Sequence, residues 1–189
     1  YNIAIEAVQE TADGIQYRMY VETPNSTDKL SAVVGDAENP SYIQSTLPMF
    51  RTGLDVDVTA NLVNPAFFGV FPSLEWESWV TIGIDNYSFE ADESSVFLIE
   101  STDWTTQFNA GNGIVMNGEF GDGWFVLPDV NNGLAGDNQR VLVGQFTTFG
   151  ILSGQIFVQM FPEGDSENAI AVHLPFGYAS DDSEAPEFT

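Results

Sequence analysis

The sequence predicts an all-β protein, a single-domain antiparallel β-sandwich of jelly-roll-like character with about 10–12 short strands. Apolar and polar residues alternate with period two, turn residues interrupt the chain at intervals of about 8–12 residues, and no long helical pattern occurs. The 189 residues, 43% hydrophobic and 13% aromatic, are enough to bury a core as one domain. The chain contains no cysteine, so disulfide bonds and thiolate metal sites are excluded.

The alternation is clearest near the N-terminus. Residues 15–22 carry apolar side chains at odd positions and mostly polar ones at even positions, and residues 3–8 are also strand-like. Asp13-Gly14 stands between the two segments, and glycine accepts the positive φ that a tight turn requires. We therefore expect these two segments to form a β-hairpin.

Nine further segments combine β-branched or aromatic residues with flanking turn residues, which predicts strands. They are residues 29–34, 41–45, 67–71, 78–84, 95–100, 123–127, 139–148, 154–161 and 169–174. We expect residues 139–148 and 154–161 to form one long hairpin that turns near Phe149-Gly150. The best helical candidate is the short segment 104–110.

The domain is expected to cover residues 1–179. Residues 180–189 hold four carboxylates and few groups that could pack. We expect this acidic segment to be a mobile tail.

The charge balance excludes several partners. There are 28 acidic residues against four basic ones, a formal charge of −24 at pH 7. Such a surface repels phosphates and anionic lipids, so nucleic acid is not expected as a partner. No apolar run approaches the roughly 18 residues of a membrane span, so membrane insertion is not expected.

The same charge makes copies of the chain repel one another. Close packing then requires salt that shortens the screening length to about 10 Å or less, or divalent cations on the carboxylates. The alternative interpretation is that the acidity only keeps a phenylalanine-rich β-protein in solution.

No catalytic site is expected, and we predict that the chain is not an enzyme. His173 is the only histidine and lies in a strand-like segment. The sequence also contains no Gly-x-Ser-x-Gly elbow and no phosphate-binding loop. Glu75 and Glu77 would share one face of a strand about 7 Å apart, a separation at which glycosidase carboxylates work. Two acids on one strand, however, do not oppose each other across a sugar.

Calcium is the one cofactor that the acidic residues suggest. Asp55 and Asp57 place two carboxylates on one side of an extended segment. Glu163, Asp165 and Glu167 gather three more in a loop. Calcium takes six to eight oxygen ligands, which such segments supply. Neither stretch has the EF-hand spacing, and the alternative is that these charges are solvated.

Four tryptophans are candidates for a carbohydrate-binding platform: Trp76, Trp79, Trp104 and Trp124. Exposed aromatic rings present apolar faces on which a polysaccharide could stack. The alternative is that these rings pack in the core, since two of them lie in strongly apolar runs.

Seven motifs carry a resemblance to a known family. They are NPAFF (64–68), FPSLE (71–75), SWVTIGI (78–84), GWFV (123–126), RVLVGQFTT (140–148), LSGQIFVQ (152–159) and FPEG (161–164). In this order, over roughly residues 20–176, they resemble an acidic β-domain family of marine algae and bacteria. That family includes the diatom pyrenoid shell proteins, which tile into sheets around the Rubisco compartment.

The resemblance implies a self-associating structural protein with no catalytic residues to carry over. Its departure lies at residues 54–62, where an Asp-x-Asp stretch replaces the expected glycine-rich loop. We therefore do not expect this chain to make the contacts that the glycine-rich loop makes in the family.

The expected function is that of a non-catalytic structural protein. Its copies would assemble as a homo-oligomer or polymer into a sheet, tube, shell or filament, through strand edges and aromatic residues near turns such as Phe67, Phe68 and Phe149. The alternative is an extracellular, calcium-dependent carbohydrate-binding or adhesion module. We expect a location outside the cell or at its surface, with the chloroplast as the alternative that the resemblance implies.

Overall fold

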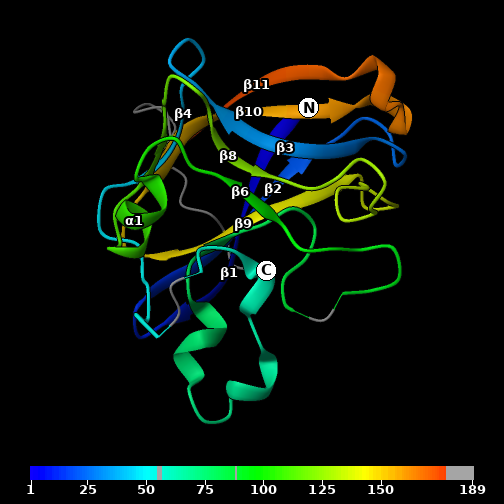
Figure 1. The fold of residues 1–189 in the computed structure, drawn as a ribbon. Helices are drawn as coiled ribbons and strands as arrows, with labels where there is room; N and C mark the ends of the chain where they lie inside the picture. Colours follow the sequence, from blue (N-terminus) through cyan, green and yellow to red (C-terminus); the bar gives the residue numbers. More distant parts are fainter. Residues whose placement is uncertain (55–56, 88, 178–189) are drawn as a thin grey trace.

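The structure is a computed structural model that describes residues 1–54, 57–87 and 89–177. It confirms the predicted fold class: the chain is nearly all β, a single domain with two antiparallel sheets of four and seven strands (Figure 1). The predicted tail, residues 180–189, and the last two residues of the predicted domain lie outside the described residues.

The first sheet has the strand order β1-β2-β9-β5. Its strands are β1 (Asn2–Thr11), β2 (Gly14–Glu22), β9 (Arg140–Thr148) and β5 (Trp79–Val80). The predicted N-terminal hairpin is confirmed as β1 and β2, paired from Asn2↔Glu22 to Thr11↔Gly14. Gly14 has a φ of +147°, and a Cβ there would lie 2.6 Å from the carbonyl carbon of Thr148, so the hairpin requires glycine at this position.

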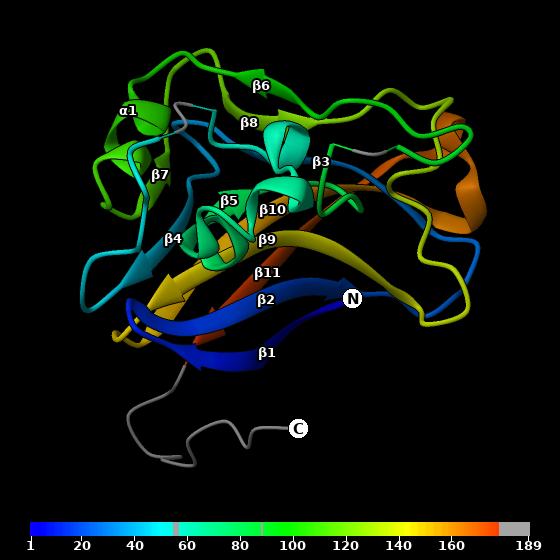
Figure 2. The ribbon, with the colours of Figure 1, turned by 90° about the horizontal axis from the view of Figure 1, so that it is seen from below.

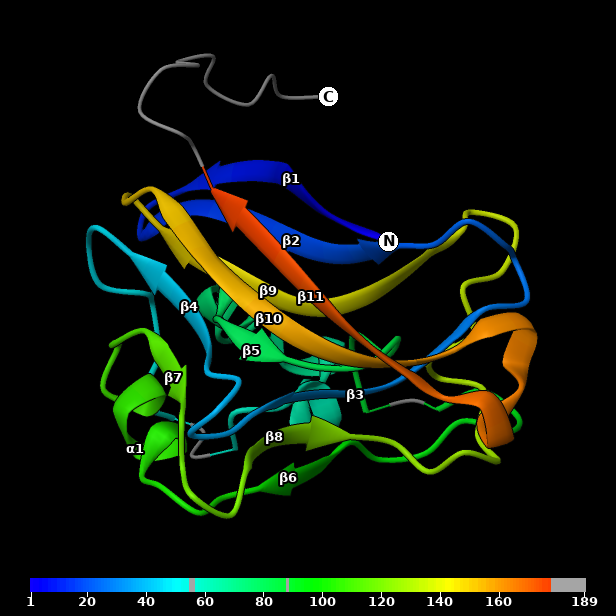
Figure 3. The ribbon, with the colours of Figure 1, turned by 90° about the horizontal axis from the view of Figure 1, so that it is seen from above.

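The second sheet is organised around β10 (Leu152–Phe161). The second half of β10 pairs with β3 and its first half with β4, while β11 runs along its other edge. Figure 3 shows β11, β10, β3, β8 and β6 following one another across this sheet. The remaining strands are β3 (Lys29–Gly35), β4 (Ser41–Ser45), β6 (Phe97–Ile99), β7 (Ile114–Met116), β8 (Asp122–Phe125) and β11 (Ile170–Gly177).

The predicted hairpin of residues 139–148 and 154–161 is wrong. β9 belongs to the first sheet and β10 to the second, so the residues between them carry the chain from one layer to the other. The hydroxyl of Thr148 donates to the carbonyls of Leu47 and Pro48, at 3.2 and 3.0 Å, and accepts from the Gly150 amide at 2.9 Å. These bonds fasten the crossing to the segment after β4.

The predicted strand at residues 67–71 is also wrong. Two 3₁₀ helices occupy this region, η2 (Pro65–Phe67) and η3 (Pro72–Trp76), following η1 (Ala60–Leu62). Proline begins both η2 and η3, and the Asn64 side chain accepts from the Ala66 amide, which favours a helical turn over an extended strand. The three helices form a lobe that projects from the sandwich (Figure 1).

Side-chain hydrogen bonds fasten this lobe to the first sheet. The amide of Gln145 on β9 donates to the carbonyls of Glu75 and Glu77, at 3.1 and 2.9 Å. Glu77 is itself buried, and its carboxylate lies 3.6 Å from the buried guanidinium of Arg51. These contacts attach the C-terminal end of the lobe to the first sheet.

The core lies between the sheets, and Trp104 and Phe108 of α1 (Trp104–Asn109) pack into it. This helix, the only α-helix among the described residues, confirms the helical prediction. Trp104 of α1 packs on Trp124 of β8 with ring centroids 5.9 Å apart, and Phe108 meets Phe146 at 6.1 Å. No helix in the described part of the chain is long and apolar enough to cross a membrane.

Candidate functional site

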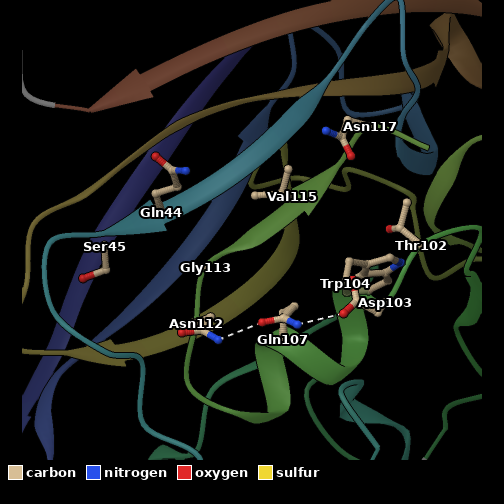
Figure 4. A pocket seen from close by; sticks show the side chains of 10 residues that line it. All are labelled: Gln44, Ser45, Thr102, Asp103, Trp104, Gln107, Asn112, Gly113, Val115 and Asn117. Carbon is tan, nitrogen blue, oxygen red and sulfur yellow. Dashed lines mark hydrogen bonds between the residues drawn. The ribbon is translucent and has the colours of Figure 1, made fainter. Parts of the chain in front are cut away.

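A surface groove of about 640 Å³ is formed by β4, β7 and α1 (Figure 4). Side chains alternate along the two strands: Ile43 and Ile114 point into the core, whereas Gln44 and Val115 face the groove. The groove is thus on the outer face of the second sheet. β7 is a strand that the sequence reasoning missed.

Polar side chains dominate the groove. Its four amides are those of Gln44, Gln107, Asn112 and Asn117, and its two hydroxyls are those of Ser45 and Thr102. Asp103 is its one carboxylate, and no basic residue lines it. The groove can therefore both donate and accept hydrogen bonds while carrying little charge.

Three of these side chains form a hydrogen-bonded chain along one wall. The Asn112 amide donates to Gln107 Oε1 at 3.0 Å, and the Gln107 amide donates to Asp103 Oδ2 at 2.7 Å (Figure 4). Asp103 and Gln107 are four residues apart on one face of a helical turn, which brings their side chains together. Gln44 and Asn117, in contrast, have no side-chain hydrogen bond to any residue that the structure describes.

A buried carboxylate beneath the groove holds two of its walls. Asp122, at the start of β8, is fully buried and accepts from the amides of Ser101 and Thr102 at 2.7 and 2.9 Å. It also accepts from the Thr102 hydroxyl and the Gly118 amide, each at 3.0 Å. Asp122 thereby joins the segment before α1 to the segment after β7.

The hydrogen bonds also determine the protonation state of this carboxylate. Burial raises the pKa of Asp122, but the four donors from Thr102, Ser101 and Gly118 outweigh burial and lower its pKa below the ordinary value. Asp122 is therefore ionised at neutral pH. In the sequence, Asp122 stands alone between Gly121 and Gly123, so no cluster of acidic residues marks it.

The groove lies at an end of the sandwich that is poor in charge. We call this the uncharged end and define it as residues 41–50, 104–118 and 147–153, none of which is charged. Figure 2 shows β4, β7, α1 and the crossing from β9 to β10 together at this end. Asp103 borders it at the groove, and Asp13 lies in the β1–β2 turn, next to the strand that pairs with Thr148. Asp13 accepts a hydrogen bond from Trp76 Nε1 at 2.9 Å.

Three apolar side chains project from the uncharged end, and we call them the apolar tip. Leu47, Phe149 and Ile151 are each more than half exposed. Backbone and side-chain bonds bring their loops together: the Thr46 amide donates to the Ile151 carbonyl at 3.2 Å, and the Ile151 amide to the Thr46 hydroxyl at 2.9 Å. Exposed apolar clusters of this kind mark interaction surfaces.

Of the predicted calcium residues, the structure describes Asp57, Glu163, Asp165 and Glu167. Asp57 Oδ1 accepts from the amide and hydroxyl of Thr59, both at 2.8 Å, and Asp55 lies outside the described residues. No group of three or more acidic or histidine side chains within the described ranges is arranged to hold a metal ion.

The second predicted calcium segment is a hydrogen-bonded turn. Asp165 accepts from the Asn168 side chain at 2.7 Å and the Glu167 amide at 3.0 Å, and these bonds lower the pKa of its carboxyl. The backbone amide of Glu163 donates to Asp28 at 2.8 Å, while the side chains of Glu163 and Glu167 are exposed.

The four tryptophans do not share an exposed face. Trp79, Trp104 and Trp124 are buried in the core, and only Trp76 is partly exposed. Trp104 and Trp124 donate to the carbonyls of Ile99 and Thr81 at 3.0 and 2.8 Å. Trp79, Trp104 and Trp124 therefore pack in the core, as the alternative interpretation expected.

The residues considered for catalysis are also separated. His173 on β11 stacks on Phe157 with ring centroids 4.6 Å apart. Glu75 and Glu77 belong to the end of η3 and the residue after it, where Glu75 is exposed and Glu77 is buried against Arg51. The two carboxylates thus do not lie side by side on a strand.

A smaller groove of about 300 Å³ lies between the first sheet and the lobe. Gln9, Gln16 and Gln145 form a ladder across its floor, with amide-to-carbonyl distances of 2.8 and 2.7 Å. Arg18 lies beside them and pairs with Asp85 at 3.2 Å. These bonds already use most of the polar groups of the floor, so we place the candidate site in the larger groove.

No family model matches the chain, and comparisons with curated proteins and with solved structures give no match. The fold and the site define an acidic all-β domain with an uncharged end that carries an apolar tip and a polar groove. The resemblance to the marine β-domain family stays a prediction.

Proposed function

We propose that this protein is a non-catalytic structural protein whose copies associate through the uncharged end. The observation that carries this proposal is the apolar tip, which projects from a charge-poor end of a molecule with a formal charge of −24. The apolar side chains of Leu47, Phe149 and Ile151 are removed from contact with water only when another surface covers them.

Electrostatics favours this end over the rest of the surface as a contact between copies. Placing like charges opposite each other at an interface costs several kcal/mol. At the uncharged end no acidic side chain projects from the contact segments, so two copies can approach with carboxylates kept at the border. At physiological salt a Debye length of about 8 Å screens the remaining repulsion.

The strand edges are less suited to the contact. β1 and β11 each have one edge unpaired within the described chain. β1 carries an irregularity at Val8, where the register with β2 shifts, and β11 contains Pro175. Bulges and proline on edge strands oppose pairing with another chain.

Growth beyond a pair of copies requires a second surface, because one self-complementary patch closes into a dimer. The lobe supplies a candidate. Residues 58–74 are free of charge, and Phe67, Val70 and Phe71 are exposed there, with Val70 70% exposed. Contact of each apolar tip with the lobe of the next copy, in place of a tip-to-tip pair, would be head-to-tail and would build a filament or a ring. Lateral contacts between such filaments would then build a sheet, tube or shell.

This proposal includes a location and a role for cations. Close association of such an anion requires screening, which supports a saline extracellular or cell-surface setting, with the chloroplast as the alternative. Calcium would then act by bridging surface carboxylates between copies.

The test compares two sets of exposed residues. We expect sedimentation velocity and electron microscopy to show assemblies at near-marine salt, and the double variant Leu47→Ser/Phe149→Ser to stay monomeric with an unchanged Tm. Phe120→Ser is the matched control, because Phe120 is 86% exposed but lies outside the uncharged end and the lobe. A wild-type protein that is monomeric at every salt concentration, or equal loss of assembly in the control, overturns the proposal.

A further inference from the structure

We infer that the groove between β4, β7 and α1 binds an uncharged, polyhydroxylated ligand, a short segment of a neutral carbohydrate. This inference rests on the groove and not on the apolar tip, although both lie at the uncharged end. It also differs from the tryptophan platform, whose rings are mostly buried.

The lining groups match the chemistry of sugar hydroxyls. A hydroxyl both donates and accepts hydrogen bonds, and so does a side-chain amide. Gln44 on β4 and Asn117 after β7 make no side-chain bond to another described residue, so both amides are available to a ligand (Figure 4). A lining in which polar side chains outnumber apolar ones suits a ligand that is rich in hydroxyl groups.

Electrostatics excludes charged ligands of either sign from this groove. No lysine or arginine lines it, and the molecule carries a formal charge of −24, so an anionic ligand meets repulsion without a counter-charge. A divalent cation would find only one carboxylate, that of Asp103, where six or more oxygen ligands are usual for calcium. A neutral ligand avoids both difficulties.

Part of the groove is organised before any ligand arrives. The chain from Asn112 through Gln107 to Asp103 orients three side chains, and the buried Asp122 holds the backbone on either side. Asp103 uses Oδ2 within this chain, so its other oxygen can accept from a ligand hydroxyl. Such a charge-assisted bond is stronger than a neutral one, and a preformed site loses less entropy on binding.

The size and floor of the groove set the expected ligand and affinity. A volume of about 640 Å³ lies within the range of small-molecule sites. Val115, 40% exposed, offers an apolar contact for the C–H face of a sugar, whereas Trp104 is buried and cannot stack. We therefore expect weak binding that depends on hydrogen bonds.

The experiment is a titration of isotope-labelled protein with defined oligosaccharides, followed by NMR chemical shifts. The probes are neutral oligosaccharides of glucose, mannose, xylose and galactose, and anionic oligouronates and sulfated galactans. We expect at least one neutral probe to shift signals of Gln44, Gln107, Asn112 and Asn117, and the anionic probes to leave them unchanged. Binding of no neutral probe, or preference for an anionic one, overturns the inference.

Matched variants locate the site. Because the Gln44 and Asn117 side chains make no hydrogen bond to another described residue, Gln44→Ala/Asn117→Ala should keep the wild-type Tm. The double variant should weaken binding at least about tenfold, which corresponds to about 1.4 kcal/mol. Asn2→Ala removes an exposed amide from β1 and should bind normally. Unchanged binding in the double variant overturns the inference.

The Leu47→Ser/Phe149→Ser variant separates this inference from the proposed function. It should lose assembly and keep carbohydrate binding. A protein that binds but never assembles refutes only the proposed function. A monomeric Leu47→Ser/Phe149→Ser variant that binds no neutral probe refutes only this inference, because no second copy covers its groove.

Discussion

At the scale of single residues, Asp122 connects the core to the candidate site. Its fully buried carboxylate receives four hydrogen bonds from segments on both sides of the groove. Each hydrogen bond to a charged group contributes more than one between neutral groups, and an unpaired buried donor is costly. We therefore expect this residue to influence stability as well as the shape of the groove.

Asp122→Asn is expected to lower the free energy of unfolding by about 2 kcal/mol near neutral pH, because an amide cannot accept from donors on both sides. The folded-state pKa of Asp122 is lowered. The stabilisation that its ionised carboxylate provides is therefore complete at pH values above the unfolded-state pKa of about 3.9, and it is lost as the pH falls through the folded-state pKa. The difference between the two proteins should therefore shrink in acid.

Urea denaturation at about pH 7 and about pH 3 measures this difference. Asp137→Asn, at an exposed position, is the control and should change stability by about 0.5 kcal/mol or less. Equal stability of wild type and Asp122→Asn near pH 7 would contradict the assignment of Asp122 as a charged brace.

At the scale of elements, the crossing from β9 to β10 shapes the uncharged end. It joins the two sheets and packs against the loop after β4, which places Phe149 and Ile151 beside Leu47. Gly150 makes this packing possible. A Cβ there would lie 2.2 Å from the Ser45 hydroxyl and 2.4 Å from the Leu47 amide nitrogen.

Gly150→Ala is therefore expected to lower stability by about 1–3 kcal/mol, the usual cost of forcing extra volume into a packed site. Gly69→Ala is the matched control, because a Cβ there would meet no atom within 4 Å. Thermal unfolding followed by circular dichroism distinguishes them, and similar Tm values for both variants would refute the close approach of the two loops.

At the scale of the whole molecule, the net negative charge opposes both folding and association. A formal charge of −24 opposes compaction within one copy as well as contact between copies. Salt shortens the Debye length from about 30 Å at 0.01 M to about 3 Å at 1 M, so it relieves both.

The Tm of the protein is therefore expected to rise with sodium chloride, and to rise similarly in the monomeric Leu47→Ser/Phe149→Ser variant. Differential scanning fluorimetry over this salt range measures the effect. If only the assembling wild type gained stability, the gain would come from association and not from screening within each copy.

Local signals predicted the parts of this fold that depend on neighbouring residues. The hairpin of β1 and β2 follows from alternation and from the glycine at residue 14, and the short helix at Trp104 was also recognised. The strand predicted at residues 67–71 failed because Asn64 and Pro65 favour a 3₁₀ turn over an apolar run that resembles a strand.

By itself, the sequence determined the fold class, the absence of cysteine chemistry and the surface charge, because periodicity, composition and turn residues act locally or additively. Only the tertiary structure decided that β9 and β10 part into different sheets, that three of the four tryptophans are buried, and that Gln44, Asp103 and Asn117 meet in one groove. These outcomes depend on contacts between residues far apart in the chain, and no local pattern specifies which strands become neighbours.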